Sequence, residues 1–253
     1  MARTFSCLSL LNRDDQTGFR LDSTLTHKNM SALNTTGPTL TTHTDFLNKH
    51  QTQLQTTCWN FTKTETTSEV CIGVVKASGV HQKSPSQHAA DLEMIQALDP
   101  VQPVLFHGSC NKKEIECIRV GGASNEGPSH VEVQFLWTER HINRPTKVTL
   151  VTTRSSGYSF LNRVELQTGC LSRGHSNLFI PSTLSGDTYD EEGQFCEDKH
   201  CANMEAAIRQ YIERVDDTPC MGTSIKLYRG NSDHPFLERR GRLLIFLKGS
   251  ARD

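Results

Sequence analysis

The sequence predicts an α/β domain in which a mixed β-sheet is flanked by helices, and three observations support this prediction. Two β-branched or alternating runs near the start read as adjacent strands. Further along, short strand-like runs alternate with segments in which apolar residues recur at helical spacing. The 253 residues, of which 35% are hydrophobic and 22% charged, are enough for one large domain with a core of ordinary size. Adjacent strands followed by strand–helix alternation are typical of a mixed sheet with helices on its faces.

The first part of the chain is predicted to contain two strands and a long insertion. Residues 3–12 alternate in polarity and are expected to form a strand, and residues 18–23 are expected to form a second one after a polar turn. Residues 24–68 are rich in Thr, Asn, Gln, His and Lys and show no lasting helical period. This composition predicts a long, partly extended insertion or loop.

The middle of the chain is predicted to alternate between strands and helices. The expected strands are residues 69–79, 114–120 and 147–153, and the expected helices are residues 88–98, 129–142 and 158–173. Ser129 and Glu132 have the spacing of a capping box at the start of one of these helices.

The end of the chain is predicted to be helical, over residues 198–215 and 235–248. The complete order of elements is also that of the ribonuclease-H fold, although many other α/β proteins share it. We therefore expect a ribonuclease-H-like core over residues 1–190, with residues 24–68 as its insertion, and a C-terminal helical extension over residues 191–253.

Acidic residues stand at two of the three places where such a fold would carry phosphodiester chemistry. Hydrolysis or strand transfer at a two-metal site needs carboxylates that converge on a pair of Mg²⁺ ions. In a ribonuclease-H-like sheet these lie on the first strand, at the end of the fourth strand and on the helix after the fifth. Asp14 and Asp15 follow the first expected strand, and Glu165 lies on the last of these helices. The middle position holds Gly121.

Five segments resemble a group of transposon-derived animal proteins whose cores are similar to DDE transposases and integrases. They are RDDQTGFRLD (13–22), VVKASGV (74–80), RVGGASNEGPSHVEVQFLWTERH (119–141), TTRSSGYSFLNRVELQTG (152–169) and GHSNLFIPSTLSG (174–186). EGPSH and NRVELQ are the most specific of these words, and the resemblance covers most of residues 5–249. It implies that Asp14, Asp15 and Glu165 are catalytic ligands of Mg²⁺ or Mn²⁺. It also implies DNA as a partner, an oligomeric state and a nuclear location.

The chain departs from that group at two acidic positions. In the group the middle strand ends in Asp-Gly, and another Asp shortly precedes EGPSH, whereas this chain has Gly121 and Asn125 there. Both departures remove a carboxylate, so we expect little or no cleavage activity. Glu126 could replace the middle carboxylate only if the loop after Gly122 turned back toward the site. Members of the group continue beyond the position of Asp253, so the chain is expected to be a fragment.

Each acidic candidate also has a simpler interpretation. Asp14 and Asp15 could form a polar turn between two strands, where Asp is common. Glu165 could be a surface carboxylate or a partner of Arg163. The basic residues near the end of the chain could form a solvated face or a strip that contacts phosphates; they are Arg239, Arg240, Arg242, Lys248 and Arg252.

Two further constellations are weaker candidates. A zinc site could draw on Cys196, His200, Cys201 and Cys220, but its spacing matches no familiar motif. Cys170 and His175 could form a nucleophile–base pair, but no orienting group is evident. The rival to a nucleic-acid-processing domain is therefore a non-catalytic binding or scaffold protein that retains the fold.

Charge and composition narrow the class of partner. The net charge is -1, so the chain has no global field that would attract nucleic acid, and DNA binding would need a local basic patch or metal ions. No apolar run approaches the roughly 20 residues of a membrane span. The nine scattered cysteines favour reduced thiols in an intracellular protein. No small-molecule substrate is evident from the sequence.

Overall fold

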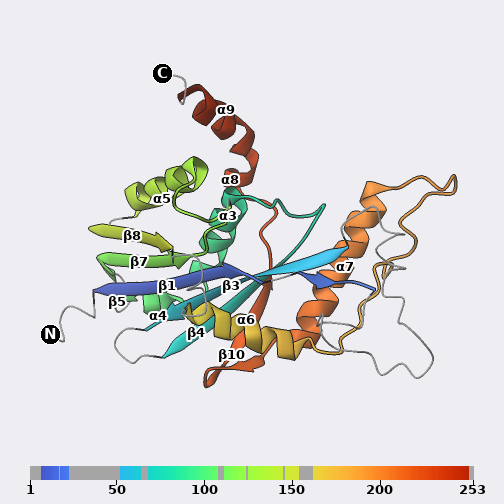
Figure 1. The fold of residues 1–253 in the computed structure, drawn as a ribbon, viewed down its shortest axis with the longest axis horizontal. Helices are drawn as coiled ribbons and strands as arrows, with labels where there is room; N and C mark the ends of the chain where they lie inside the picture. Colours follow the sequence, from blue (N-terminus) through green and yellow to red (C-terminus); the bar gives the residue numbers. More distant parts are fainter. Residues whose placement is uncertain are drawn as a thin grey trace.

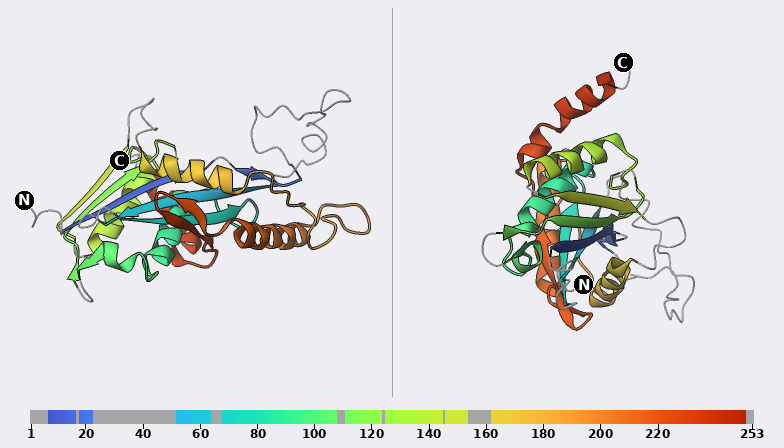
Figure 2. Two further views of the ribbon diagram at one scale, coloured as in Figure 1. Left: turned by 90° about the horizontal axis from the view of Figure 1, so that it is seen from below. Right: turned by 90° about the vertical axis from the view of Figure 1, so that its left-hand side faces the viewer.

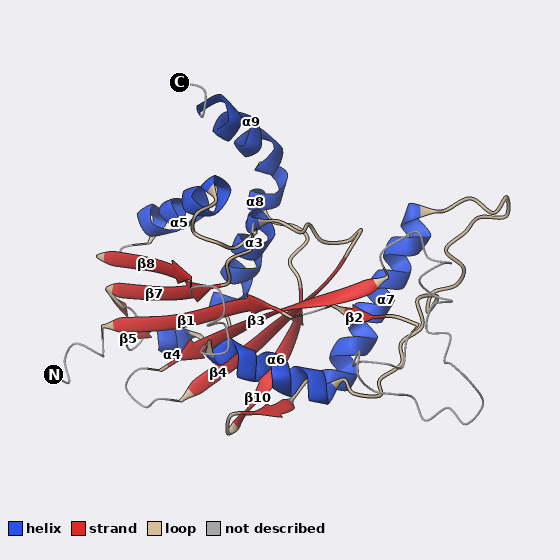
Figure 3. Ribbon diagram, viewed as in Figure 1, coloured by secondary structure: helices blue, strands red, loops and turns tan. Residues whose placement is uncertain are grey.

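The computed structural model describes residues 7–16, 18–22, 52–63, 68–107, 111–123, 125–144, 146–153 and 162–250. The elements in chain order are β1 (Leu8–Asp15), β2 (Phe19–Arg20), β3 (Gln53–Thr62), β4 (Glu69–Ala77), α3 (Pro85–Gln96), α4 (Gln102–Leu105), β5 (Phe106–His107), β6 (Asn111–Lys112), β7 (Ile115–Val120), α5 (Val131–Asn143), β8 (Val148–Thr153), α6 (Arg163–Gly174), α7 (Glu197–Val215), β9 (Thr218–Cys220), β10 (Thr223–Arg229), α8 (Pro235–Glu238) and α9 (Arg240–Ser250). They form an α/β structure with a mixed sheet flanked by helices, as the sequence predicted (Figures 1 and 3).

The strand order of the main sheet is β8-β7-β1-β3-β4-β10-β9, and β2 pairs with β3 beside this path. β1, β7 and β8 run parallel to one another, whereas β3 is antiparallel to both β1 and β4. The parallel pairing brings the carboxyl ends of β1 and β7 to the same edge of the sheet. β5 and β6 form a separate small hairpin.

The prediction of an insertion over residues 24–68 is wrong for β3, which lies inside the sheet between β1 and β4. Its sequence, QLQTTCWNFT, is rich in Thr and Gln, and this composition is more typical of a loop than of a buried strand. A buried strand can carry such residues only when distant groups satisfy their hydrogen bonds. Thr57 is an example, because its hydroxyl donates to Asp15 Oδ1 at 2.6 Å. Most of the remaining expected insertion lies outside the described residues.

Each face of the sheet has its own apolar core, because successive side chains of a strand point to opposite faces. Figure 2 shows that helices lie on both faces of the sheet. Helices α6 and α7 cover one face, around Leu54, Val75, Val164, Leu171, Met204, Ile208 and Tyr211. Helices α3 and α4, with Trp137 of α5, cover the other face, around Leu11, Trp59, Phe61, Ile72, Leu92, Ile95 and Ile118. We call these the α6 face and the α3 face.

The prediction of helices alone after residue 190 is also wrong. α7 is present as expected, but β9 and β10 follow it and join the main sheet, where Ile225 pairs with Cys71 of β4. The sheet therefore takes strands from both sides of the boundary expected at residue 190. The expected helix 235–248 is divided into α8 and α9, and α9 extends away from the sheet at the C-terminal end (Figure 1).

Side-chain caps form at the starts of α3 and α6 but not at the start of α5. Ser84 caps α3 by accepting from the Gln87 backbone N–H, and Asn162 caps α6. The capping box predicted for α5 does not form, because its N-cap residue is His130 and the Glu132 carboxylate accepts from Arg240 instead. Residues 158–161 of the helix expected at 158–173 are not among those described. Within the described ranges, no helix has the length and apolarity needed to cross a membrane.

Candidate functional site

The ends of β1 and β7 bring two of the sequence-predicted positions together. Asn12 of β1 pairs with Arg119 of β7, and this parallel register places Asp14 beside Gly121, the residue that follows β7. A Cβ atom on Gly121 would lie 3.1 Å from Asp14 Oδ1. A side chain at position 121 would therefore project directly at the Asp14 carboxylate.

Glu126 already occupies the space beside Gly121. A Cβ atom there would overlap Glu126 Oε1, because the loop folds back with the Glu126 and Gly127 backbone N–H groups both donating to Ala123 O. The loop thus meets the condition under which Glu126 could replace the missing carboxylate. Its other oxygen, Oε2, accepts from Arg13 Nη2 at 3.1 Å, and both side chains are almost completely buried.

Asp14 lies on the α6 face in a crowded acidic environment. Burial raises the pKa of its carboxyl to about 7, and the negative charges of Glu126 and Glu165 contribute to the rise, against a backbone N–H donated by Asp15. Glu165, in the first turn of α6, is thus near enough for its charge to act on Asp14. Burial also raises the pKa of Glu126, and the Arg13 guanidinium counters that rise. We refer to Asp14, Glu126 and Glu165 as the acidic cluster.

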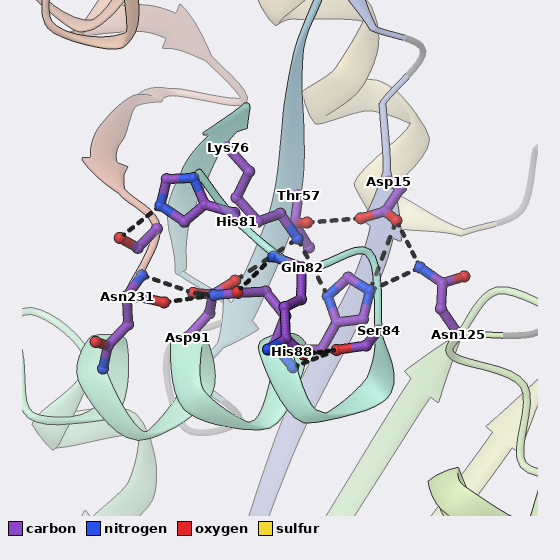
Figure 4. Close-up of polar contacts among 12 residues, drawn as sticks. Asp15, Thr57, Lys76, His81, Gln82, Ser84, His88, Asp91, Asn125 and Asn231 are labelled. Atoms are coloured by element: carbon purple, nitrogen blue, oxygen red, sulfur yellow. Dashed lines mark hydrogen bonds and ion pairs between the residues drawn. The ribbon is translucent and has the colours of Figure 1, made fainter. Parts of the chain in front are cut away.

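Asp15 points to the opposite face of the sheet from Asp14, because successive side chains of a strand alternate between faces. Figure 4 shows it directed toward Thr57, His88 and Asn125. Its carboxylate accepts from Thr57 and, at 3.2 Å, from Asn125 Nδ2, and Oδ2 lies 3.6 Å from His88 Nε2. Burial acts to raise the pKa of Asp15, but the Lys76 and Arg13 cations and the Thr57 hydrogen bond outweigh it, so the pKa is lowered and the carboxyl is ionised.

A buried polar chain continues from Asp15 into α3 (Figure 4). Lys76 Nζ lies 3.4 Å from His88 Nδ1 and 3.6 Å from Asp91 Oδ2. Burial lowers the pKa of His88 well below its usual value, and the Arg13 and Lys76 cations lower it further, which keeps the ring neutral. A neutral imidazole has one acceptor nitrogen, yet the amino group of Lys76 and, at 2.9 Å, the amide nitrogen of Asn125 both approach the ring. Two donor groups, on Lys76 and Asn125, therefore approach a ring that can accept only one hydrogen bond.

The residues near Gly121 do not fit the two-metal centre that the resemblance implies. Among the described residues, no three or more His, Cys, Asp and Glu side chains form a group that could hold a metal ion. Asp15 faces away from the acidic cluster, and Glu126 is already paired with Arg13. Only Asp14 and Glu165 remain as uncommitted carboxylates, fewer than a pair of Mg²⁺ ions needs.

The residues of the possible zinc site and of the possible cysteine–histidine pair form hydrogen bonds with other groups. Cys201 Sγ donates to Gly79 O at 3.6 Å, and Cys196, His200, Cys201 and Cys220 belong to no metal-binding group within the described ranges. His175 Nδ1 lies 2.7 Å from the Tyr211 hydroxyl, so the ring's described hydrogen bond is not to Cys170.

Two of the five basic residues near the chain end form ion pairs with α5. Arg239 binds Glu139 through both of its terminal nitrogens, and Arg240 Nε donates to Glu132 at 2.9 Å. These pairs attach α8 and α9 to α5. Arg252 lies outside the described residues.

The polar chain on the α3 face is what sequence reasoning missed. Its signals were present: Lys76 interrupts an otherwise apolar strand, and His88 and Asp91 share helical spacing with the buried Leu92 and Ile95. Polar residues on an apolar face need buried partners, and such partners mark a network. The roles of Arg13 and Glu126 depend on the path of a loop and were not readable from spacing.

Comparison with known proteins identifies no relative: no family model, no curated protein and no solved structure matches the chain.

Proposed function

We propose that this chain is a degenerate DDE-transposase-like domain with a ribonuclease-H-like core, which has lost efficient cleavage of nucleic acid. The observation that carries the proposal is the arrangement around Gly121. Where the resemblance implies a metal-binding Asp, the space is filled by Glu126, whose charge is balanced by the buried guanidinium of Arg13.

The order of the strands supports the ancestral part of the proposal. Counting β1, β3, β4, β7 and β8 as the first to fifth strands, Asp14 lies at the end of the first and Gly121 at the end of the fourth. Glu165 lies on α6, the helix that follows the fifth strand. These are the places at which a ribonuclease-H-like sheet carries its acids. DNA as the partner, an oligomeric state and a nuclear location are part of this proposal because the resemblance implies them.

The electrostatics support the loss of cleavage. A buried ion pair resists removal of one partner, because the remaining charge would be left uncompensated. Arg13 therefore holds Glu126 in its present position and supplies the positive charge on that side of the acidic cluster. A divalent ion would have to compete with this guanidinium for Glu126.

Plasmid nicking by the full chain in Mg²⁺ or Mn²⁺ tests the proposal. We expect none from the unmodified chain. Restoring the carboxylate by Gly121→Asp alone would create a clash with Glu126, so the informative variant is Gly121→Asp with Glu126→Ser, which should gain weak nicking. The same double variant carrying Glu165→Gln is the control and should be inactive. Metal-dependent nicking by the unmodified chain that disappears in Glu165→Gln would overturn the proposal.

A non-catalytic binding or scaffold protein is the second candidate, and the Arg13–Glu126 pair favours it equally. Fluorescence anisotropy with labelled duplex and single-stranded DNA separates the two. Binding that weakens steeply with salt supports the nucleic-acid domain, because phosphate contacts release counterions. Absence of binding to both probes supports a scaffold with another partner.

A further inference from the structure

A cleft of about 290 Å³ lies on the α3 face between α3, α5 and α8. The cleft is lined by Arg13 of the sheet, His88 of α3, Trp137 of α5, Arg144 just after α5, Phe236 of α8 and Asn125 of the loop after β7. Its volume is just below the roughly 300–1,000 Å³ typical of small-molecule sites. Arg13 lines the cleft and also pairs with Glu126 of the acidic cluster, so the two sites adjoin at this side chain.

The inner wall of the cleft offers a hydrogen-bonding group that the described contacts of the protein do not use. Arg13 borders the cleft but is only 2% exposed, and its Nε is buried, so this nitrogen is closed to a ligand. Asn125 makes both of its described contacts through Nδ2, to Asp15 and His88, which leaves its carbonyl oxygen available as an acceptor (Figure 4).

Arg144 supplies positive charge that the cleft only partly balances. Its one described ion pair is to Glu93, at 3.8 Å, and Glu93 is shared with Arg140. Arg140 in turn donates two hydrogen bonds to Glu116. Burial lowers the pKa of Arg144 to about 10, and the nearby Arg140 cation contributes. An anionic group at this position would relieve the repulsion between the two guanidinium groups.

Aromatic side chains complete the lining. Trp137 and Phe236 both border the cleft, from different helices. Aromatic faces stack well on nucleobases without regard to sequence, and guanidinium groups suit phosphate geometry. A flat ring with a donor on its edge also matches the Asn125 carbonyl oxygen as an acceptor.

We propose that this cleft binds a mononucleotide, with its phosphate at Arg144 and its base between the helices at Trp137 and Phe236, where Asn125 Oδ1 accepts from the base edge. The occupant is either a free nucleotide or the terminal nucleotide of a single strand, which share this chemistry. The inference goes beyond the proposed function, because it requires neither cleavage nor binding of a duplex.

Tryptophan fluorescence and calorimetry of the full chain test the inference directly. The chain has two tryptophans, and Trp59 is fully buried, so quenching by an added base reports on Trp137. The probes are AMP, adenosine, ribose 5-phosphate and a 5′-phosphorylated single-stranded oligonucleotide. We expect AMP to quench and to bind more tightly than either fragment. Competition by the oligonucleotide would indicate a strand end, and its absence a free nucleotide.

Two variants test whether the nucleotide binds at the residues proposed. Arg144→Gln should weaken AMP binding about tenfold and leave adenosine binding within about twofold. Trp137→Phe should abolish the quenching while calorimetry still detects weaker binding. The matched control is Arg242→Gln, an exposed arginine on α9, which should change neither. Failure of AMP to bind at up to about 1 mM, or equal effects of Arg144→Gln and Arg242→Gln, would overturn the inference. Either result would leave DNA binding, measured separately, as the test of the proposed function.

Discussion

Asp14 and Asp15 are consecutive residues of one strand, yet the protein shifts their pKa values in opposite directions. The pKa of Asp14 is raised to about 7, by burial and by the charges of Glu126 and Glu165. The pKa of Asp15 is lowered despite burial, by the Lys76 and Arg13 cations and the hydrogen bond from Thr57. The two carboxyl groups differ because alternation along β1 directs one to the α6 face and the other to the α3 face.

The comparison shows where charge is compensated in this molecule. On the α3 face, Lys76, Arg13 and a set of hydrogen-bond donors surround Asp15, so its ionised form contributes to stability. On the α6 face, the acidic cluster gathers carboxyl groups whose negative charges repel one another, and Arg13 is committed to Glu126. A functional site that has kept its acids but lost its metal ions would be expected to have this second kind of environment.

The largest effect is expected from Asp15→Asn, which should destabilise the protein by about 3 kcal/mol at pH 7. The amide replaces a buried anion that accepts from Thr57 and Asn125, and it leaves the nearby cations without compensation. Because the folded pKa lies below the unfolded value, this stabilisation is present above about pH 4 and is lost as the pH falls toward the folded pKa. Urea unfolding over this range measures it. The control is the exposed Asp233→Asn, which should stay within about 0.5 kcal/mol of wild type.

The same substitution one residue earlier should act in the opposite direction. Asp14→Asn is expected to stabilise the protein by about 1–2 kcal/mol at pH 8 in the presence of a chelator, because it removes a repelled carboxylate. A raised folded pKa makes wild-type stability decline as the pH rises from 3.8 to about 7, so the gain should be absent below pH 3.8 and complete above about 7. Thermal unfolding at several pH values measures it. A destabilising effect of Asp14→Asn at pH 8 would show that the carboxylate is compensated by a charge that the acidic cluster does not contain.

Particular residues show how far the sequence could predict this fold and site. β4 and β7 were predicted because β-branched residues fill them, whereas β3 was not, because its Thr and Gln side chains are satisfied only by distant groups such as Asp15. β10 was missed although TSIKLYR alternates in polarity, because the neighbouring helices suggested a helical extension. The sequence predicted the position of Gly121 at the end of β7. It could not predict which of Asp14 and Asp15 lies on which face of the sheet, because a shift of one residue in register exchanges their faces.

The smallest effect in this series concerns the surplus donor at His88. Asn125→Asp would place a carboxylate 2.9 Å or so from Nε2, where the amide nitrogen now lies, and would stabilise a proton on that nitrogen. The pKa of His88 should therefore rise by about one unit or more relative to Asn125→Ala, which removes the amide without adding charge. NMR titration of the His88 ring carbons measures both values. Equal midpoints in the two variants would mean that Asn125 does not contact the ring, and the polar chain would then end at Asp15. A raised midpoint in Asn125→Asp alone would show that position 125 determines the protonation of His88, and with it the charge balance of the network on the α3 face.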